Sequence, residues 1–290
     1  MTTSSPTLTI IAGPNGAGKS TFTRNTQKLL QIPVIDPDLE ARRIQPDRPE
    51  AAAIQGGRLA LSRARSYLST NQSFAVETTL SGSTYLRMIA SAKTREWQVN
   101  LIYVGLGNVE ISIERVTQRV AAGGHNVPEE DVRRRYERSL ANLSVALQQV
   151  DHALIFDNST AAGHQNILTM ENGRVVKQAF KLPAWLLSAL PTEILQHSQM
   201  ERQDALAIAI SVQKILLHLG STQLDGSIIS AGRLLFTQQG DVITITNQEE
   251  SREILRVEGG RFIKFNPTAD ERERLTYLRN QVQSDFHQQN

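Results

Sequence analysis

The residues best suited to chemistry form one short stretch near the start of the chain: Gly13, Pro14, Asn15, Gly16, Ala17, Gly18, Lys19 and Ser20. Its glycines let consecutive backbone N–H groups curl around an anion, Lys19 can reach outer phosphates, and Ser20 can ligate Mg²⁺. An apolar run precedes the stretch and a helix-forming run, with Thr21 in its first turn, follows it, so a helix dipole adds to the attraction. The pattern predicts a phosphate-binding loop for ATP or GTP with Mg²⁺.

Three carboxylates follow the ends of two further apolar runs. Asp36 and Asp38 come directly after one run, and Glu77 ends another at 74–76. Ligands of open α/β sheets bind beyond the carboxyl ends of the strands, so we expect these acids at the same edge as the phosphate loop. Asp is also a common helix cap. For Asp36, a cap of the following turn and contact with Mg²⁺ through water both remain open.

The elements that would position these residues alternate between strands and helices over residues 1–160, as in βαβ units. The apolar runs predict five strands, at 8–12, 32–35, 73–77, 98–104 and 152–156. Amphipathic stretches between them, such as 51–70 and 108–120, predict helices. This is the cadence of an α/β P-loop fold with a five-stranded parallel sheet.

Composition excludes several other classes of protein. The 290 residues include no cysteine, which rules out disulfides, thiolate zinc sites and a cysteine nucleophile. A formal net charge of +2 gives no case for general nucleic-acid binding. The six histidines are scattered, so no transition-metal site is expected. No apolar run approaches a membrane span and the N-terminus lacks signal-peptide features, so we expect no membrane partner and a cytoplasmic protein.

Motifs of several NTPase classes are missing, including an LSGGQ-type signature and an N-K-x-D base motif. A carboxylate near a phosphate loop is instead typical of small-molecule kinases, where it accepts a hydroxyl proton. "GPNGAGKS", "VIDPD", "FAVETTLSG" and "GGHNVPEEDVRRRYERSLANL" followed by "DNS" together resemble the zeta-toxin family, particularly its branch of ABC-type ATPases or P-loop kinases. The resemblance covers about residues 8–160.

This resemblance implies a reaction and a partner. Better-studied zeta toxins phosphorylate UDP-N-acetylglucosamine on the sugar and are held inactive by an epsilon antitoxin. The expected function is therefore transfer of the γ-phosphate of ATP to a hydroxyl of a small acceptor, with UDP-N-acetylglucosamine as a candidate. The alternatives are another acceptor, such as an antibiotic, a nucleoside or a nucleic-acid end, and a non-kinase ATPase switch that works through partners.

The resemblance also assigns roles to the residues at and just after the ends of the second and third predicted strands. It makes Asp38 the catalytic base and Glu77 a substrate contact, with Asp36, Thr78 and Thr79 beside the substrate. The chain departs from the toxins at Thr78, where they have glycine. That change lies on the substrate side, so the nucleotide chemistry carries over better than the identity of the acceptor.

Arginines of a lid are the remaining catalytic candidates that the resemblance implies. Here they are Arg119, Arg134 and Arg135, which would stabilise the transferring phosphoryl charge; the alternative for any one of them is a solvated helix face. We interpret His125 as a turn residue, with a nucleotide contact as the alternative. Asn158 would shape the adenine pocket or form part of a plain turn.

The chain is expected to divide into a kinase domain at 1–180 and an accessory α+β module at 181–290. Two strands around an Asn-Gly turn are predicted within 167–180, hairpins at 232–246 and 252–265, an amphipathic stretch from about 192 to 219 and a helix at 268–287. The module could extend the core, inhibit the kinase in cis, dock a partner, or recognise something else.

Overall fold

The computed structural model describes residues 5–124, 126–179, 181–196, 203, 207–212, 221–223, 226–259, 261–265 and 267–287. The chain divides into two compact units, residues 1–174 with 182–194, and residues 175–181 with 195–290. Within the described residues, no helix combines the length and the apolar character needed to cross a membrane.

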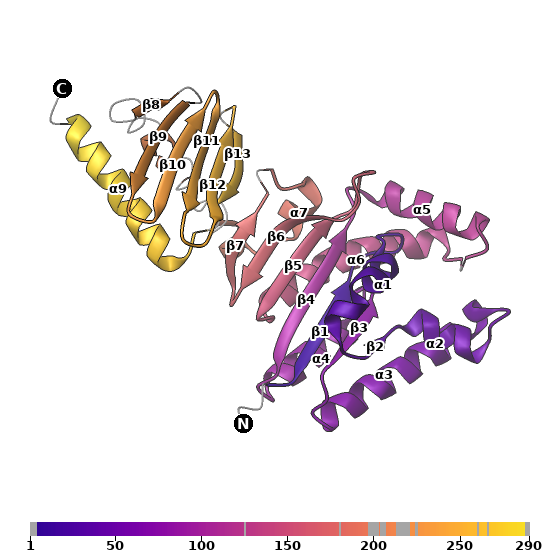
Figure 1. Ribbon diagram of the computed structural model, residues 1–290. Helices are drawn as coiled ribbons and strands as arrows, with labels where there is room; N and C mark the ends of the chain where they lie inside the picture. Colours follow the sequence, from indigo (N-terminus) through magenta and orange to yellow (C-terminus); the bar gives the residue numbers. More distant parts are fainter. Residues whose placement is uncertain are drawn as a thin grey trace. The chain divides into compact units, whose positions relative to one another are not determined.

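A parallel sheet is the centre of the first unit (Figure 1). Five strands run parallel in the order β2-β3-β1-β4-β5. They are β1 (Thr7–Ala12), β2 (Val34–Ile35), β3 (Phe74–Thr78), β4 (Gln98–Gly105) and β5 (His152–Asp157). The α/β P-loop fold and the five predicted strands are confirmed.

Two more strands enlarge this sheet, so the predicted total of five is wrong. β6 (Gln165–Glu171) pairs antiparallel with β5, and β7 (Arg174–Gln178) follows it at the edge. Asn172 and Gly173 have φ values of 49° and 77°, as a two-residue hairpin turn requires. The hairpin was predicted, but not its place in the sheet; there it pairs the N–H and C=O groups that β5 would otherwise expose.

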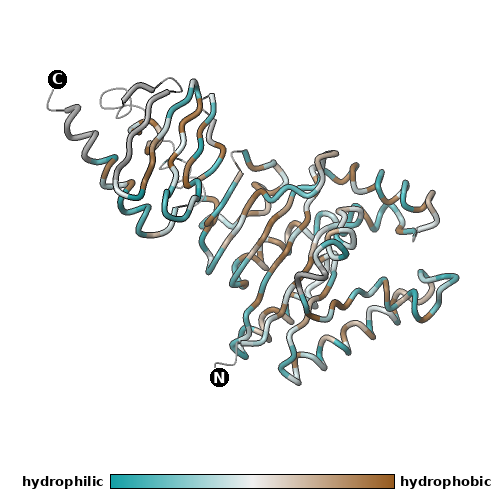
Figure 2. The backbone as a smooth tube through the Cα atoms, in the orientation of Figure 1, coloured by the Kyte–Doolittle hydropathy of each residue, from teal (hydrophilic) through white to brown (hydrophobic). Residues whose placement is uncertain are grey.

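Apolar side chains fill both faces of the central strands, and Figure 2 shows these strands as predominantly brown. Ile10 of β1 and Leu101 of β4 are register partners on one face, Ile11 and Ile102 are partners on the other, and all four are buried. A strand that is covered on both faces needs continuous rather than alternating hydrophobicity. This explains why the strands were recognisable as apolar runs.

Helices connect and cover the strands. They are α1 (Lys19–Leu30), α2 (Pro37–Ile44), α3 (Ala53–Ser69), α4 (Ser83–Lys93), α5 (Val109–Ala121), α6 (Glu129–Leu147) and α7 (Ala184–Ala189), with a 3₁₀ turn at Pro49–Ala52. The helices predicted within 51–70 and 108–120 are therefore confirmed. α6 is fixed to the sheet by Tyr136, whose hydroxyl donates to the Leu106 carbonyl at 2.8 Å.

The second unit is built on a six-stranded antiparallel sheet in the order β13-β12-β11-β10-β9-β8. Its elements are β8 (Ser221–Gln223), β9 (Gly226–Ala231), β10 (Leu234–Gln239), β11 (Val242–Asn247), β12 (Arg252–Glu258), β13 (Arg261–Phe265) and α9 (Ala269–His287). Both predicted hairpins and the last helix are confirmed. Of the amphipathic stretch at 192–219, residues 192–196 and 207–212 are helical, and much of the rest lies outside the described residues.

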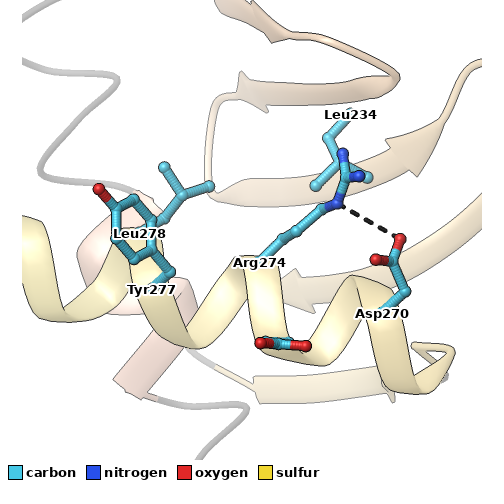
Figure 3. A pocket seen from close by; sticks show the side chains of 6 residues that line it. Leu234, Asp270, Arg274, Tyr277 and Leu278 are labelled. Atoms are coloured by element: carbon cyan, nitrogen blue, oxygen red, sulfur yellow. Dashed lines mark ion pairs between the residues drawn. The ribbon is translucent and has the colours of Figure 1, made fainter.

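A small core holds this second unit together. Phe236, Ile245 and Leu255 of the sheet pack with Leu275 of α9. Figure 3 shows a pocket beside α9, where Asp270 and Arg274 form an ion pair of 3.3 Å. The other residues that line this pocket are Leu234, Glu273, Tyr277 and Leu278.

Candidate active site

Residues 13–18 form the loop that joins β1 to α1, as the motif predicts. Gly13 has a φ of 143°, and a Cβ there would lie 2.1 Å from the Val104 carbonyl oxygen of the neighbouring strand β4. Gly18 caps α1 in the left-handed conformation, with a φ of 89°. Only glycine fits at these two positions. Their glycines allow the loop to curl tightly at the carboxyl edge of the sheet.

Lys19 begins α1 and lies among the predicted acids. Burial lowers the pKa of Lys19, as it does for any ammonium group removed from water. Three carboxylates oppose that shift in pKa, and they belong to Glu77, Asp38 and Asp36. The charge of Arg119 lowers the pKa further. The electrostatic field at Lys19 thus arises from the acids and the lid arginine that the sequence had singled out.

Glu77 is tied to the first turns of α1. The Ser20 hydroxyl donates to Glu77 Oε1 at 2.6 Å, and the Thr23 hydroxyl donates to Oε2 at 3.0 Å. Glu77 is buried, with an exposed fraction of only 6%. The contact joins the predicted Mg²⁺ ligand Ser20 to a carboxylate, and such oxygen donors suit a hard cation.

Asp36 lies beside Glu77 because of strand register. Ile35 of β2 is paired with Val76 of β3, so the residues that follow them leave the sheet next to one another. The Asp36 side chain accepts from the Asp38 backbone N–H at 2.9 Å and caps α2, which confirms the cap interpretation. Burial, followed by the charges of Glu77 and Asp38, raises the pKa of Asp36 to about 6.

Asp38 lies in the first turn of α2 and is exposed. Its charge acts on both Lys19 and Arg119. Burial lowers the pKa of Arg119, which belongs to the last turn of α5, and the Asp38 carboxylate opposes this. The structure therefore brings a solvent-accessible carboxylate, the loop lysine and one lid arginine into one electrostatic neighbourhood.

The other two candidate arginines form ion pairs within α6. Arg134 and Arg135 approach the Asp131 carboxylate at 2.5 Å and 3.6 Å. Neither is among the charges that act on Lys19, whereas Arg119 is. His125, between α5 and α6 in the sequence, lies outside the described residues.

The loop that follows β3 is held in a strained conformation. Thr78 Oγ1 accepts from the Leu80 N–H at 3.0 Å, and Thr79 and Ser81 share a hydroxyl hydrogen bond of 2.9 Å. Leu80 is buried with a φ of 55°, which is uncommon for a residue with a side chain. Asn142 of α6 donates to the Leu80 carbonyl at 2.7 Å, so the loop is fixed from outside as well.

Five consecutive carbonyl groups of the phosphate loop each accept a hydrogen bond from a side chain. The pairs, donor first, are Lys19 to Pro14 (3.0 Å), Ser112 to Asn15, Arg115 to Gly16 (3.5 Å), Asn158 to Ala17 (2.9 Å) and His164 to Gly18 (3.2 Å). Asn158, predicted near the adenine, thus contacts the loop itself. Ser112, Arg115 and His164 were missed, because no local spacing links them to a loop about 100 or more residues earlier in the chain.

Tyr85 of α4 is a further residue that the motifs did not indicate. Burial, and then the charge of Asp36, raises the pKa of the Tyr85 phenol to about 12. The phenol therefore stays protonated at neutral pH. It can donate a hydrogen bond on the side of the site where Asp36 lies.

Comparison with known proteins gives the family. The family model for "Zeta toxin" matches residues 1–168, more than half of the chain. The chain belongs to the zeta-toxin family. An uncharacterized protein of Haemophilus influenzae is 39% identical over 124 residues, which cover 43% of this chain and 88% of that protein. With the phosphate loop and the α/β sheet in place, this zeta-toxin family member is a P-loop kinase.

The chain also shows a low similarity to several solved structures. A putative kinase from Chloroflexus aurantiacus is 20% identical, with a TM-score of 0.37 over 45% of this chain and 79% of that one. The structure described as the PezAT chromosomal toxin-antitoxin system of Streptococcus pneumoniae is 17% identical, with a TM-score of 0.45 over 69% of this chain and 86% of that one.

Proposed function

We propose that this protein transfers the γ-phosphoryl group of ATP to a hydroxyl of a small acceptor, with Asp38 as the general base. A hydroxyl is a poor nucleophile, and a carboxylate beside it both orients it and accepts its proton as the new P–O bond forms. The observation that carries the proposal is the position of Asp38. Its side chain is exposed to solvent, and its charge acts on both Lys19 and Arg119.

The other predicted roles fit around this base. Lys19 would leave the Pro14 carbonyl to neutralise the outer phosphates, and Arg119 would stabilise the charge of the transferring group. Arg134 and Arg135 stay predictions, since their observed partner is Asp131.

The Ser20 hydroxyl and the Glu77 carboxylate are the oxygen donors that would hold Mg²⁺, directly or through water. When bound, this ion supplies charge neutralisation at the phosphoryl oxygens. Ser20 would then turn its hydroxyl hydrogen away from the cation. Contacts of Asp36, Glu77, Thr78 and Thr79 with the acceptor remain predictions.

The test is ADP release with Mg²⁺ and ATP, using UDP-N-acetylglucosamine and a panel of other nucleotide sugars, nucleosides and antibiotics. Asp38→Asn should lower acceptor-dependent turnover by about 10²–10⁴, the usual contribution of a general base, while ATP still binds. Asp47→Asn, at another exposed acid in the turn after α2, is the matched control and should be fully active.

Two results would separate the alternatives. A phosphorylated product from an acceptor other than UDP-N-acetylglucosamine would keep the kinase and replace its substrate. Acceptor-independent turnover that survives Asp38→Asn would reject the kinase and leave an ATPase switch. We further propose that a separate antitoxin, or residues 181–290 in cis, inhibits the kinase. Faster ADP release after removal of either inhibitor than in its presence would support this.

A further inference from the structure

The phosphate loop is held from outside by two elements that are far from it in the sequence. Ser112 and Arg115 come from α5, and Asn158 and His164 come from the segment after β5. We call these four side chains the carbonyl collar, since each donates a hydrogen bond to a different loop carbonyl. Asn158 is 9% exposed, and Ser112 is fully buried.

The direction of these hydrogen bonds has a consequence for the loop. A peptide unit is planar and its C=O and N–H groups point in opposite directions. When a donor holds a carbonyl on the outside of a tight loop, the N–H of the same peptide unit faces the concave side. Several N–H groups that converge in this way form an anion-binding nest. Without the collar, the loop would have to be ordered when the anion binds.

The contact at Gly18 shows how closely the collar fits. A Cβ at Gly18 would lie 2.7 Å from Asn158 Nδ2 and 3.1 Å from His164 Nε2. The His164 ring also meets the Phe22 ring of α1 edge to face, with centroids 5.5 Å apart. Because the Gly18 carbonyl only accepts, His164 Nε2 must carry a hydrogen.

We propose that the carbonyl collar, with His164 as the member that contacts the last loop carbonyl, preorganises the phosphate loop for the triphosphate of the nucleotide. His164 is a positioning residue in this role, because it acts on the nucleotide through the Gly18 peptide. The inference rests on the proposed function only in that both require the loop to bind ATP. It does not depend on the acceptor or on the base.

Direct binding of a non-hydrolysable ATP analogue with Mg²⁺, measured by calorimetry, tests this proposal. His164→Phe keeps a ring against Phe22 and removes the donor, and it should weaken binding about three- to tenfold, as loss of one hydrogen bond would. His164→Gln restores an N–H at a similar reach and should return the affinity to within about twofold of wild type. His152→Gln, at the opposite end of β5, is the matched control and should change nothing.

A second variant tests the contact that α5 makes with the loop. Ser112→Ala should weaken analogue binding in the same way, since it frees the Asn15 carbonyl. Each variant is compared with wild type for its thermal unfolding midpoint without ligand, so that lost affinity is separated from lost fold. If folded His164→Phe and Ser112→Ala bind the analogue like wild type, the collar proposal is overturned. Failure of wild type itself to bind would overturn the proposed kinase as well.

Discussion

At the scale of single residues, Asp36 makes the stability of the fold depend on pH. Its pKa is raised from the usual 3.8 to about 6, first by burial and then by the charges of Glu77 and Asp38. A carboxyl group with a raised pKa in the folded state favours its neutral form there. The contribution of Asp36 to the free energy of unfolding is therefore largest below the unfolded pKa and is lost as pH rises through about 6.

We expect Asp36→Asn to remove this loss, because asparagine keeps the capping oxygen without the charge. At pH 7.5, without nucleotide, the variant should be more stable than wild type by up to about 3 kcal/mol, from a shift of about two pH units. The gap should close near pH 4. Urea unfolding of both proteins between pH 4 and 8 measures this difference in the free energy of unfolding. A difference that is constant, or that widens toward low pH, would contradict a raised pKa of Asp36.

At the scale of elements, the helix pair α2 and α3 positions the base. A Cβ at Gly56 of α3 would lie 2.6 Å from the Ala41 nitrogen and 2.7 Å from the Pro37 oxygen, both backbone atoms of α2. Gly56 therefore sets how closely α2 packs. α2 also carries Asp38, so the same contact fixes the position of the proposed base.

We expect Gly56→Ala to push α2 away, lower the free energy of unfolding by about 1–3 kcal/mol and reduce phosphoryl transfer more than ATP binding. Gly57→Ala is a matched control, since a Cβ there meets nothing within 4 Å. It should be neutral or stabilise the helix by up to about 1 kcal/mol. Denaturant unfolding and analogue binding measure both effects, and equal behaviour of the two variants would show that the helix contact does not matter.

At the scale of the whole molecule, the two units have separate cores. The phosphate loop, the acids and Arg119 all belong to the first unit. The apolar core of the second unit is formed by its own sheet and helices. A ligand that binds only one unit should stabilise only that unit.

Scanning calorimetry should therefore show two transitions. A non-hydrolysable ATP analogue with Mg²⁺ at about 100 times its Kd should stabilise the first unit by about 2.7 kcal/mol and raise one midpoint by roughly 5–10 °C. Lys19→Ala should abolish that rise and leave the other transition in place. One transition that moves as a whole would instead mean that the two units unfold together.

The sequence by itself determined the local features of this protein. The phosphate loop is one contiguous motif, and the central strands β1, β3 and β4 are apolar runs because they are buried on both faces. The position of Asp36 and Asp38 at a strand end followed from those runs. Membership of the zeta-toxin family followed from the same motifs in combination.

Only the tertiary structure decided which distant residues meet. It placed the β6–β7 hairpin in the sheet and brought Arg119 to where its charge lowers the pKa of Lys19. It also brought Ser112 and His164 to the phosphate loop. The physical reason is that these contacts depend on strand order and helix packing. A hydrogen bond between residues about 100 or more positions apart leaves no periodic trace in the sequence.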